Sequence, residues 1–115
     1  LIHCSAGRDR TGLLAALTHR LLGVSEADIL SDYLLSNAAP GMEKRVAGLM
    51  KRIAARTGQE PSLQAVRAAF MADAAYLAGA LRVIEEAHGS VEAYLRDGMG
   101  VDDALRERIE ARLLD

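Results

Sequence analysis

The stretch of sequence that decides the fold and chemistry is His3-Cys4-Ser5-Ala6-Gly7-Arg8-Asp9-Arg10-Thr11-Gly12. It follows the short apolar run Leu1-Ile2-His3, which we predict to be the end of a strand, and it precedes a long helical pattern. A loop between a strand and a helix can turn its backbone N–H groups inward and form a nest for an anion. The positive end of the following helix dipole adds to that attraction. The segment therefore predicts a phosphate-binding loop.

Individual side chains of the loop suit the chemistry of phosphate esters. Arg10 can hold two phosphate oxygens with its planar guanidinium, and Gly7 allows backbone geometry that other residues resist. Helix N-termini and nearby cations lower the pKa of a thiol, so Cys4 would be a thiolate able to attack phosphorus. Thr11 is placed to offer its hydroxyl to the sulfur. Asp9 is the only carboxylate in the loop, and it could protonate the leaving oxygen and later activate water.

The predicted catalytic residues are thus Cys4, Asp9, Arg10 and Thr11, and the predicted phosphate contacts are Ser5, Ala6, Gly7, Arg8, Asp9 and Arg10. We expect His3 to support the loop by hydrogen bonding, because neighbours on a strand point to opposite faces and His3 would face away from Cys4. The alternatives are a buried structural role for Cys4 and a plain ion pair with an arginine for Asp9. For Arg8, a substrate contact and a solvated surface charge are equally compatible with the sequence.

Composition narrows the class of protein. The 115 residues carry a formal net charge of −2, half are hydrophobic, and one is a cysteine. A single domain is expected, without a disulfide framework or a cysteine-rich zinc site. There is no apolar run of the roughly 18 residues that a membrane span needs, and no basic block or aromatic platform for nucleic acid. We predict no metal or organic cofactor, because Arg10 and the loop amides can supply the charge that a metal would provide.

From Arg10 onward the apolar residues recur at helical spacing, and the fold class is mainly α: one N-terminal strand, the phosphate loop, and then about six helices packed as a bundle. Expected helix starts include Ser25, Ser90 and Asp102 or Asp103, whose side chains can cap a helix, and Pro61, which suits a first turn. The basic residues between Lys44 and Arg56 are expected to form a solvated helix face, with a membrane-surface role as the alternative.

Three segments, in order, resemble one family. The loop matches the H-C-x5-R-[ST] signature of cysteine-dependent tyrosine phosphatases, and the string HCSAGRDRTG is similar to the H-C-x-x-G-K-D-R-T-G loop of their bacterial branch. Residues 32–37, DYLLSN, resemble that branch's D-Y-L-x-S-N segment, and residues 89–97, GSVEAYLRD, its G-S-x-x-x-Y-L-R-D segment. The chain therefore resembles the bacterial protein tyrosine phosphatase-like family.

That resemblance implies an α/β phosphatase domain of which residues 1–115 would be the C-terminal, loop-bearing helical half, with the sheet portion upstream. It implies Cys4 as nucleophile, Arg10 as phosphate binder and Asp9 as the acid, since this branch keeps an aspartate inside the loop. Arg8 stands where the branch has lysine, which replaces a point charge by a planar fork. The implied substrate is a phosphotyrosine protein, with a phosphoinositide as the alternative and phosphate or vanadate as site ligands.

Other interpretations stay open at this point. A Cys–x5–Arg spacing also occurs in rhodanese-like and arsenate-reductase loops, although the flanking His3 and Thr11-Gly12 favour a phosphatase. The chain could be a phosphate-binding module without turnover, or a redox sensor, because a thiolate of low pKa oxidises readily. The presence of both Asp9 and Thr11 favours turnover. Since Leu1 is not a methionine, we expect an upstream half of the domain, either in the same chain or supplied by a swapped or co-associated chain. We expect a cytoplasmic location for the protein, with secretion as the alternative.

Overall fold

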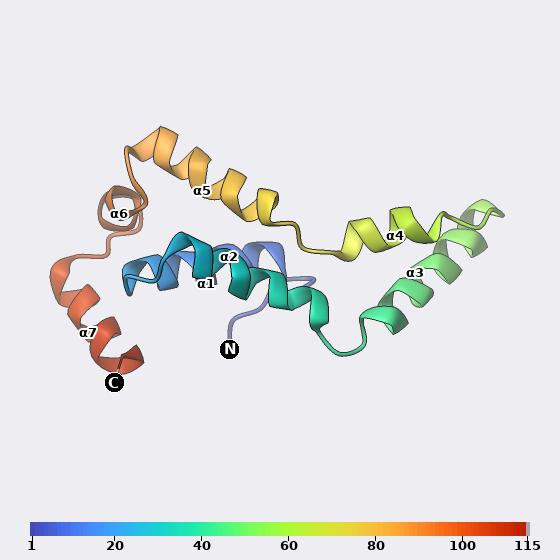
Figure 1. Ribbon diagram of the computed structural model, residues 1–115, viewed down its shortest axis with the longest axis horizontal. Helices are drawn as coiled ribbons and strands as arrows, with labels where there is room; N and C mark the ends of the chain where they lie inside the picture. The colour runs from blue at the N-terminus through green and yellow to red at the C-terminus, as the bar shows by residue number, and fades with distance from the viewer. Residues whose placement is uncertain (115) are drawn as a thin grey trace.

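The computed structural model describes residues 1–114, and helices make up most of them (Figure 1). In chain order the helices are α1 (Asp9–Leu21), α2 (Glu26–Leu34), the 3-10 helix η1 (Leu35–Ala38), α3 (Met42–Thr57), α4 (Leu63–Phe70), α5 (Ala74–His88), α6 (Val91–Ala93), the π-helical turn η2 (Tyr94–Gly98) and α7 (Asp103–Leu113). The mainly helical fold class predicted from the sequence is confirmed.

The main core lies between α1, α2, α5 and α6. Ile29 of α2 and Val91 of α6 are each only 1% exposed, and Leu17, Leu77 and Leu81 are nearly as well covered. Buried residues lie four positions apart on α1 (Leu17, Leu21), on α2 (Ile29, Tyr33) and on α5 (Leu77, Leu81), so each of these helices buries one apolar stripe. The phosphate loop is joined directly to this core, because α1 begins inside the loop at Asp9.

The helices α3 and α4 form a separate pair that reaches away from this core (Figure 1). Val46 of α3 and Val66 of α4 are buried, but neither belongs to the main core. The described residues measure 56 × 31 × 23 Å, with a radius of gyration of 17.5 Å, whereas a compact domain of this size has about 13 Å. The expectation of one bundle is therefore corrected: the chain has a core and an arm, since α3 and α4 bury their apolar stripes mainly against each other.

Polar side chains start the helices where the sequence predicted them. Ser25, Ser90 and Asp102 each accept a hydrogen bond from a backbone N–H in the first turn of α2, α6 and α7 respectively. This contact satisfies a donor that has no partner inside the helix. Pro61 differs slightly from expectation, because it lies one residue before the cap of α4, which is Ser62.

The predicted strand at residues 1–3 is not formed, and no strand occurs in residues 1–114. The side chain of Ile2 is 65% exposed and Leu1 is fully exposed. A strand needs a neighbouring strand to receive its backbone hydrogen bonds, and the described helices offer none. Among these helices, none combines the length and the apolar character that crossing a membrane requires.

Candidate active site

The loop that follows Cys4 carries backbone N–H groups that favour the ionised form of its sulfur. They belong to Thr11, Arg8 and Ala6, and within residues 1–114 none of them makes a hydrogen bond of regular geometry with the sulfur. Gly7 lies between two of these donors with a φ of +67°, a left-handed conformation that a residue with a Cβ resists. Several N–H groups converging on one atom form an anion-binding nest. The loop is therefore arranged to stabilise negative charge at the position of the thiol.

This environment lowers the pKa of the Cys4 thiol from 9.0 to about 6. The Thr11 hydroxyl is the largest cause, the three backbone N–H groups add to it, and partial burial opposes it. The hydroxyl oxygen is itself buried; its approach to the sulfur falls short of regular hydrogen-bond geometry, and no other partner in residues 1–114 competes for it. At pH 7 a group with this pKa is about nine-tenths ionised, so Cys4 is mainly a thiolate.

Replacing Thr11 by valine is expected to raise the pKa of Cys4 by roughly one unit, because the largest stabilising contact of the thiolate is lost. The measurement is the rate of iodoacetamide alkylation of Cys4 between pH 4 and pH 9, followed by mass spectrometry of the Cys4 peptide in the full-length protein. The half-maximal rate should move to higher pH in Thr11→Val and stay in place in Thr11→Ser, which keeps the hydroxyl. An unchanged midpoint in Thr11→Val would contradict this account of the thiolate.

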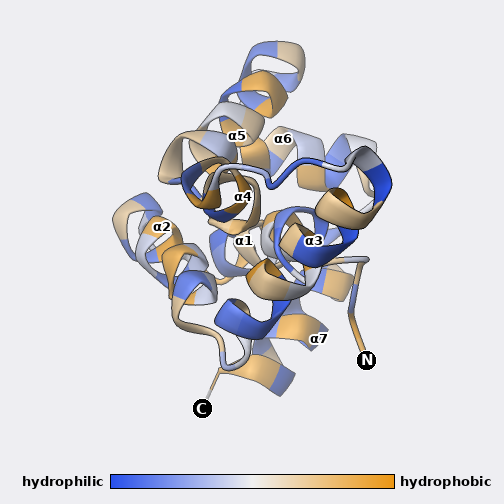
Figure 2. Cartoon of the chain, turned by 90° about the vertical axis from the view of Figure 1, so that its right-hand side faces the viewer, coloured by the Kyte–Doolittle hydropathy of each residue, from blue (hydrophilic) through white to orange (hydrophobic). Residues whose placement is uncertain are grey.

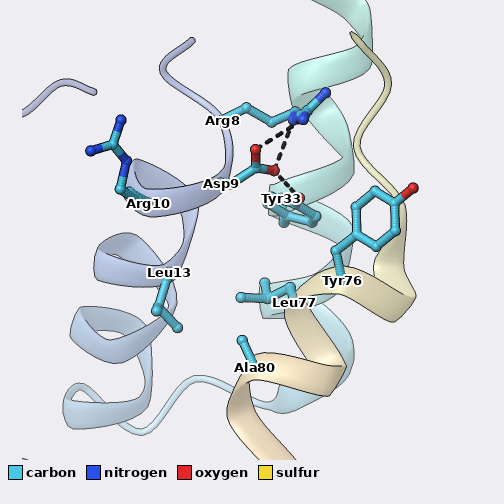
Figure 3. A pocket seen from close by; sticks show the side chains of 8 residues that line it. All are labelled: Arg8, Asp9, Arg10, Leu13, Tyr33, Tyr76, Leu77 and Ala80. Atoms are coloured by element: carbon cyan, nitrogen blue, oxygen red, sulfur yellow. Dashed lines mark hydrogen bonds and ion pairs between the residues drawn. The ribbon is translucent and has the colours of Figure 1, made fainter. Parts of the chain in front are cut away.

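Asp9 and Arg8 form a two-pronged ion pair at the start of α1 (Figure 3). The Nε and Nη2 atoms of Arg8 donate to Oδ1 and Oδ2 of Asp9 at 2.8 and 2.9 Å. The phenol of Tyr33, on α2, donates to Oδ1 of Asp9 at 3.2 Å. The Arg8 guanidinium, and to a smaller extent this phenol, hold the pKa of the Asp9 carboxyl below its usual range.

This pairing bears on the role that the sequence suggested for Asp9. A carboxyl whose pKa is lowered is ionised at neutral pH and holds no proton to give to a leaving group. A carboxylate is instead suited to accept a proton from attacking water. For Asp9 to act as the acid, it would have to leave Arg8 and Tyr33 first.

The remaining donor of Arg8 ties the loop to the connection between α4 and α5. Its Nη1 atom donates to the backbone carbonyl oxygens of Ala69 and Met71 at 3.0 and 3.3 Å. Ala72, the residue after Met71, is held by Asn37 of η1. The Asn37 side chain accepts a hydrogen bond from the N–H of Ala72 at 2.6 Å and donates one to its carbonyl oxygen at 2.9 Å. The Arg8 side chain is thus held in internal contacts and is only 18% exposed.

The glycine that ends the loop motif is required by packing. A Cβ built on Gly12 would lie 2.7 Å from Cδ2 of Tyr33, well inside van der Waals contact. The Tyr33 ring is 5% exposed and rests on this glycine, which lets its hydroxyl reach Asp9. Residues 32–37 therefore support the loop directly through Tyr33, and through Asn37 they hold the connection between α4 and α5 to which Arg8 is bonded.

A cavity of about 350 Å³ opens beside the loop between α1, α2 and α5. Arg8, Asp9 and Tyr33 form its polar end, and Leu77 lies on its apolar side, close to the exposed Tyr76 (Figure 3). The sequence did not single out Tyr76. Nothing in the local pattern separates it from other helical residues, since only the crossing of α5 over α1 and α2 brings it there.

The other predicted site residues are less constrained. Arg10 points away from the Asp9 side of α1 (Figure 3), and its guanidinium makes no hydrogen bond or ion pair in the part of the chain that the structure describes. His3 is exposed and likewise makes no hydrogen bond within residues 1–114. The expected hydrogen-bonding support from His3 is therefore not seen, because no neighbouring strand fixes residues 1–3. No group of three metal-ligating side chains gathers within residues 1–114.

Comparison with known proteins shows the family to which this sequence belongs. The sequence matches the tyrosine phosphatase family over residues 1–115, and the chain therefore belongs to that family. A protein of Cupriavidus necator assigned to the tyrosine-protein phosphatases is 42% identical over 109 residues, which are 90% of this chain and 36% of that protein. The triple specificity protein phosphatase PtpB of Mycobacterium tuberculosis is 35% identical over 121 residues, covering 99% of this chain and 43% of PtpB. The chain thus spans less than half the length of either relative.

Proposed function

We propose that this chain carries the catalytic loop of a protein tyrosine phosphatase that hydrolyses phosphate monoesters through a cysteinyl-phosphate intermediate. The observation that carries the proposal is the loop around Cys4, whose backbone N–H groups and Thr11 hydroxyl lower the thiol pKa to about 6. A thiolate in an anion-binding nest is a nucleophile placed where a phosphate would sit.

In the first step the Sγ thiolate of Cys4 donates an electron pair to phosphorus, and the bond between phosphorus and the tyrosine oxygen breaks. The leaving phenolate takes up a proton from solvent water, because Asp9 is ionised in its pair with Arg8. Charge on the three equatorial oxygens is met by the inward N–H groups of the loop and by Arg10, whose unpaired guanidinium can turn onto the phosphate. The described residues thus supply a nucleophile and charge stabilisation from side chains and backbone.

In the second step a water oxygen attacks phosphorus, the sulfur–phosphorus bond breaks, and the thiolate and inorganic phosphate are released. Thr11 stabilises the departing thiolate, because its hydroxyl is the strongest influence on the sulfur. Asp9 is the carboxylate nearest in sequence to take the proton from water, and its ion pair with Arg8 keeps it ionised for that purpose.

The substrate proposed first is phosphotyrosine in a protein, which the family membership supports. The test is hydrolysis by the full-length protein of one peptide carrying either phosphotyrosine or phosphoserine, with a phosphoinositide in mixed micelles as a third substrate. We expect kcat/KM for phosphotyrosine to exceed the other two by at least about tenfold, and vanadate to inhibit. Faster turnover of the phosphoinositide would favour the lipid alternative, and a vanadate-induced rise in Tm without any turnover would favour a binding module.

A further inference from the structure

The positive charge of the molecule is concentrated on one helix. α3 carries the cations Lys44, Arg45, Lys51, Arg52 and Arg56 and the single carboxylate Glu43, a net charge of +4. The whole chain has −2, so the remaining residues together carry −2 − 4 = −6. Such an asymmetry marks a surface that attracts anions.

These five cations lack partners among the residues that the structure describes. Glu43 is already paired with Arg67 of α4 at 2.6 Å, and within residues 1–114 none of the five makes a hydrogen bond or an ion pair. By contrast, Arg8, Arg20 and Arg106 are all paired with carboxylates. The basic face of α3 therefore meets only solvent and is available to an external anion.

One end of this basic face opens beside the phosphate loop. A groove of about 260 Å³ runs between the loop and the arm. Its walls include Ala6, Gly7 and Arg8 of the loop, Met42 and Arg45 of α3, and Phe70 of α4. Because Ala6, Gly7 and Arg8 belong to the loop between Cys4 and α1, the groove lies beside that loop.

From that groove a row of arginines leads outward. Arg45, Arg52 and Arg56 are seven and four residues apart, which places them within about 40° of one line along a helix. We name them the α3 arginine row. In Figure 1, α3 runs away from the loop toward the end of the arm, so the row begins at the groove and continues outward. Arg52 and Arg56 also border a second hollow on α3 with Leu49.

We propose that the α3 arginine row binds acidic side chains that flank the phosphotyrosine of a protein substrate, and so selects the substrate. This inference rests on the proposed function and adds a specificity element to it. An extended peptide leaving the Cys4 site through the groove would run along α3. At about 1.5 Å per helical residue and about 3.3 Å per extended residue, Arg52 and Arg56 lie roughly three and five peptide residues beyond Arg45.

The structure favours a peptide over an anionic membrane. A helix that lies in a membrane surface buries a broad apolar face, but the apolar side of α3 is turned toward α4, where Val46 is 2% exposed. Figure 2 shows α3 and α4 next to each other, with hydrophobic and hydrophilic residues interspersed along both ribbons. What α3 offers to an external partner is a line of cations spaced for an extended acidic chain.

The test compares phosphotyrosine peptides with glutamates on the N-terminal side, with glutamates on the C-terminal side, or with alanines on both. The full-length protein is measured beside the triple variant Arg45→Gln, Arg52→Gln, Arg56→Gln. A matched control, Arg82→Gln, Arg108→Gln, Arg112→Gln, removes three exposed cations of α5 and α7. p-Nitrophenyl phosphate, which does not reach α3, reports the basal chemistry.

We expect the wild type to prefer one acidic series over alanine by about tenfold in kcat/KM. The triple variant should lose that preference but keep its activity on p-nitrophenyl phosphate within twofold of the wild type. The control variant should keep both the preference and the activity. Equal turnover of acidic and neutral peptides by the wild type would overturn the inference. An equal loss of the acidic preference in the control variant would overturn it too. Reduced pelleting of the triple variant with anionic vesicles, without any peptide preference, would assign the row to a lipid surface instead.

Failure of the proposed function can be told apart from failure of this inference. If the wild type hydrolyses no substrate, the same peptides are made with a non-hydrolysable phosphonate and their binding is followed by fluorescence anisotropy. Tighter binding of an acidic series that the triple variant loses would support the row as a recognition surface, even though turnover is absent. Equal binding of acidic and neutral phosphonates would refute it.

Discussion

Replacing Cys4 by serine in the full-length protein is expected to abolish hydrolysis of p-nitrophenyl phosphate, lowering kcat by about 10⁴-fold or more. The loop brings the thiol pKa to about 6, which makes a thiolate at neutral pH. A serine hydroxyl ionises so much less readily that the same loop leaves it protonated. Steady-state kinetics at pH 6 to 7 measure the loss.

The control for this variant is binding without chemistry. The side chains of cysteine and serine differ by one atom, and the Cys4 side chain is only partly buried, so the fold and the loop amides should persist. Vanadate or phosphate should still raise the Tm of Cys4→Ser, because a ligand that binds only the folded state stabilises it. Activity within tenfold of the wild type would exclude Cys4 as the nucleophile.

Replacing Arg10 by alanine is expected to lower kcat/KM by about 10² to 10³-fold, because charge on the phosphoryl oxygens loses a preorganised donor. Arg10 lies at the start of α1 and makes no internal ion pair within residues 1–114. Its loss should therefore leave the Tm nearly unchanged. Both kcat and KM should be affected, since the guanidinium contacts phosphate in the ground state and in the transition state.

Arg10→Lys distinguishes charge from geometry. Lysine keeps the positive charge but lacks the planar pair of donors that matches two phosphate oxygens, so its kcat/KM should fall between those of the wild type and Arg10→Ala. Arg82→Ala, which removes an exposed arginine of α5, serves as the control and should behave as wild type. If Arg10→Lys and Arg10→Ala have the same kcat/KM, the positive charge alone contributes little to catalysis. If Arg10→Ala retains full activity, Arg10 is not the phosphate binder.

Local sequence patterns predict the helix starts and the family of this protein. Helix starts at Ser25, Ser90 and Asp102 follow from side chains that can reach the free N–H groups of a first turn. The family follows from the loop and two further segments, and the match over the whole chain confirms it. These features depend on residues close together in sequence, and such residues act on each other whatever the rest of the chain does.

Local sequence patterns do not predict the features that depend on contacts between residues far apart in the chain. The strand expected at residues 1–3 is absent, because a strand is stabilised only by a neighbour that no local pattern supplies. The α3–α4 arm was expected to join one bundle, since an apolar stripe shows that a helix packs but not against which partner. For Arg8 the sequence weighed phosphate against solvent, and the structure holds its guanidinium on Asp9 and on carbonyls over sixty residues away.

By itself, the sequence determined the family, the loop that holds Cys4 and Arg10, and the mainly helical character, because each of these is encoded in a contiguous stretch or a helical period. Only the tertiary structure decided the contact of Tyr33 with Asp9, the pairing of Asn37 with Ala72, and the position of Arg45, the first residue of the α3 arginine row, beside the loop. Each of these arises where helices remote in sequence are packed together, and the charge, burial and hydrogen bonds of a residue are set by the neighbours that such packing brings.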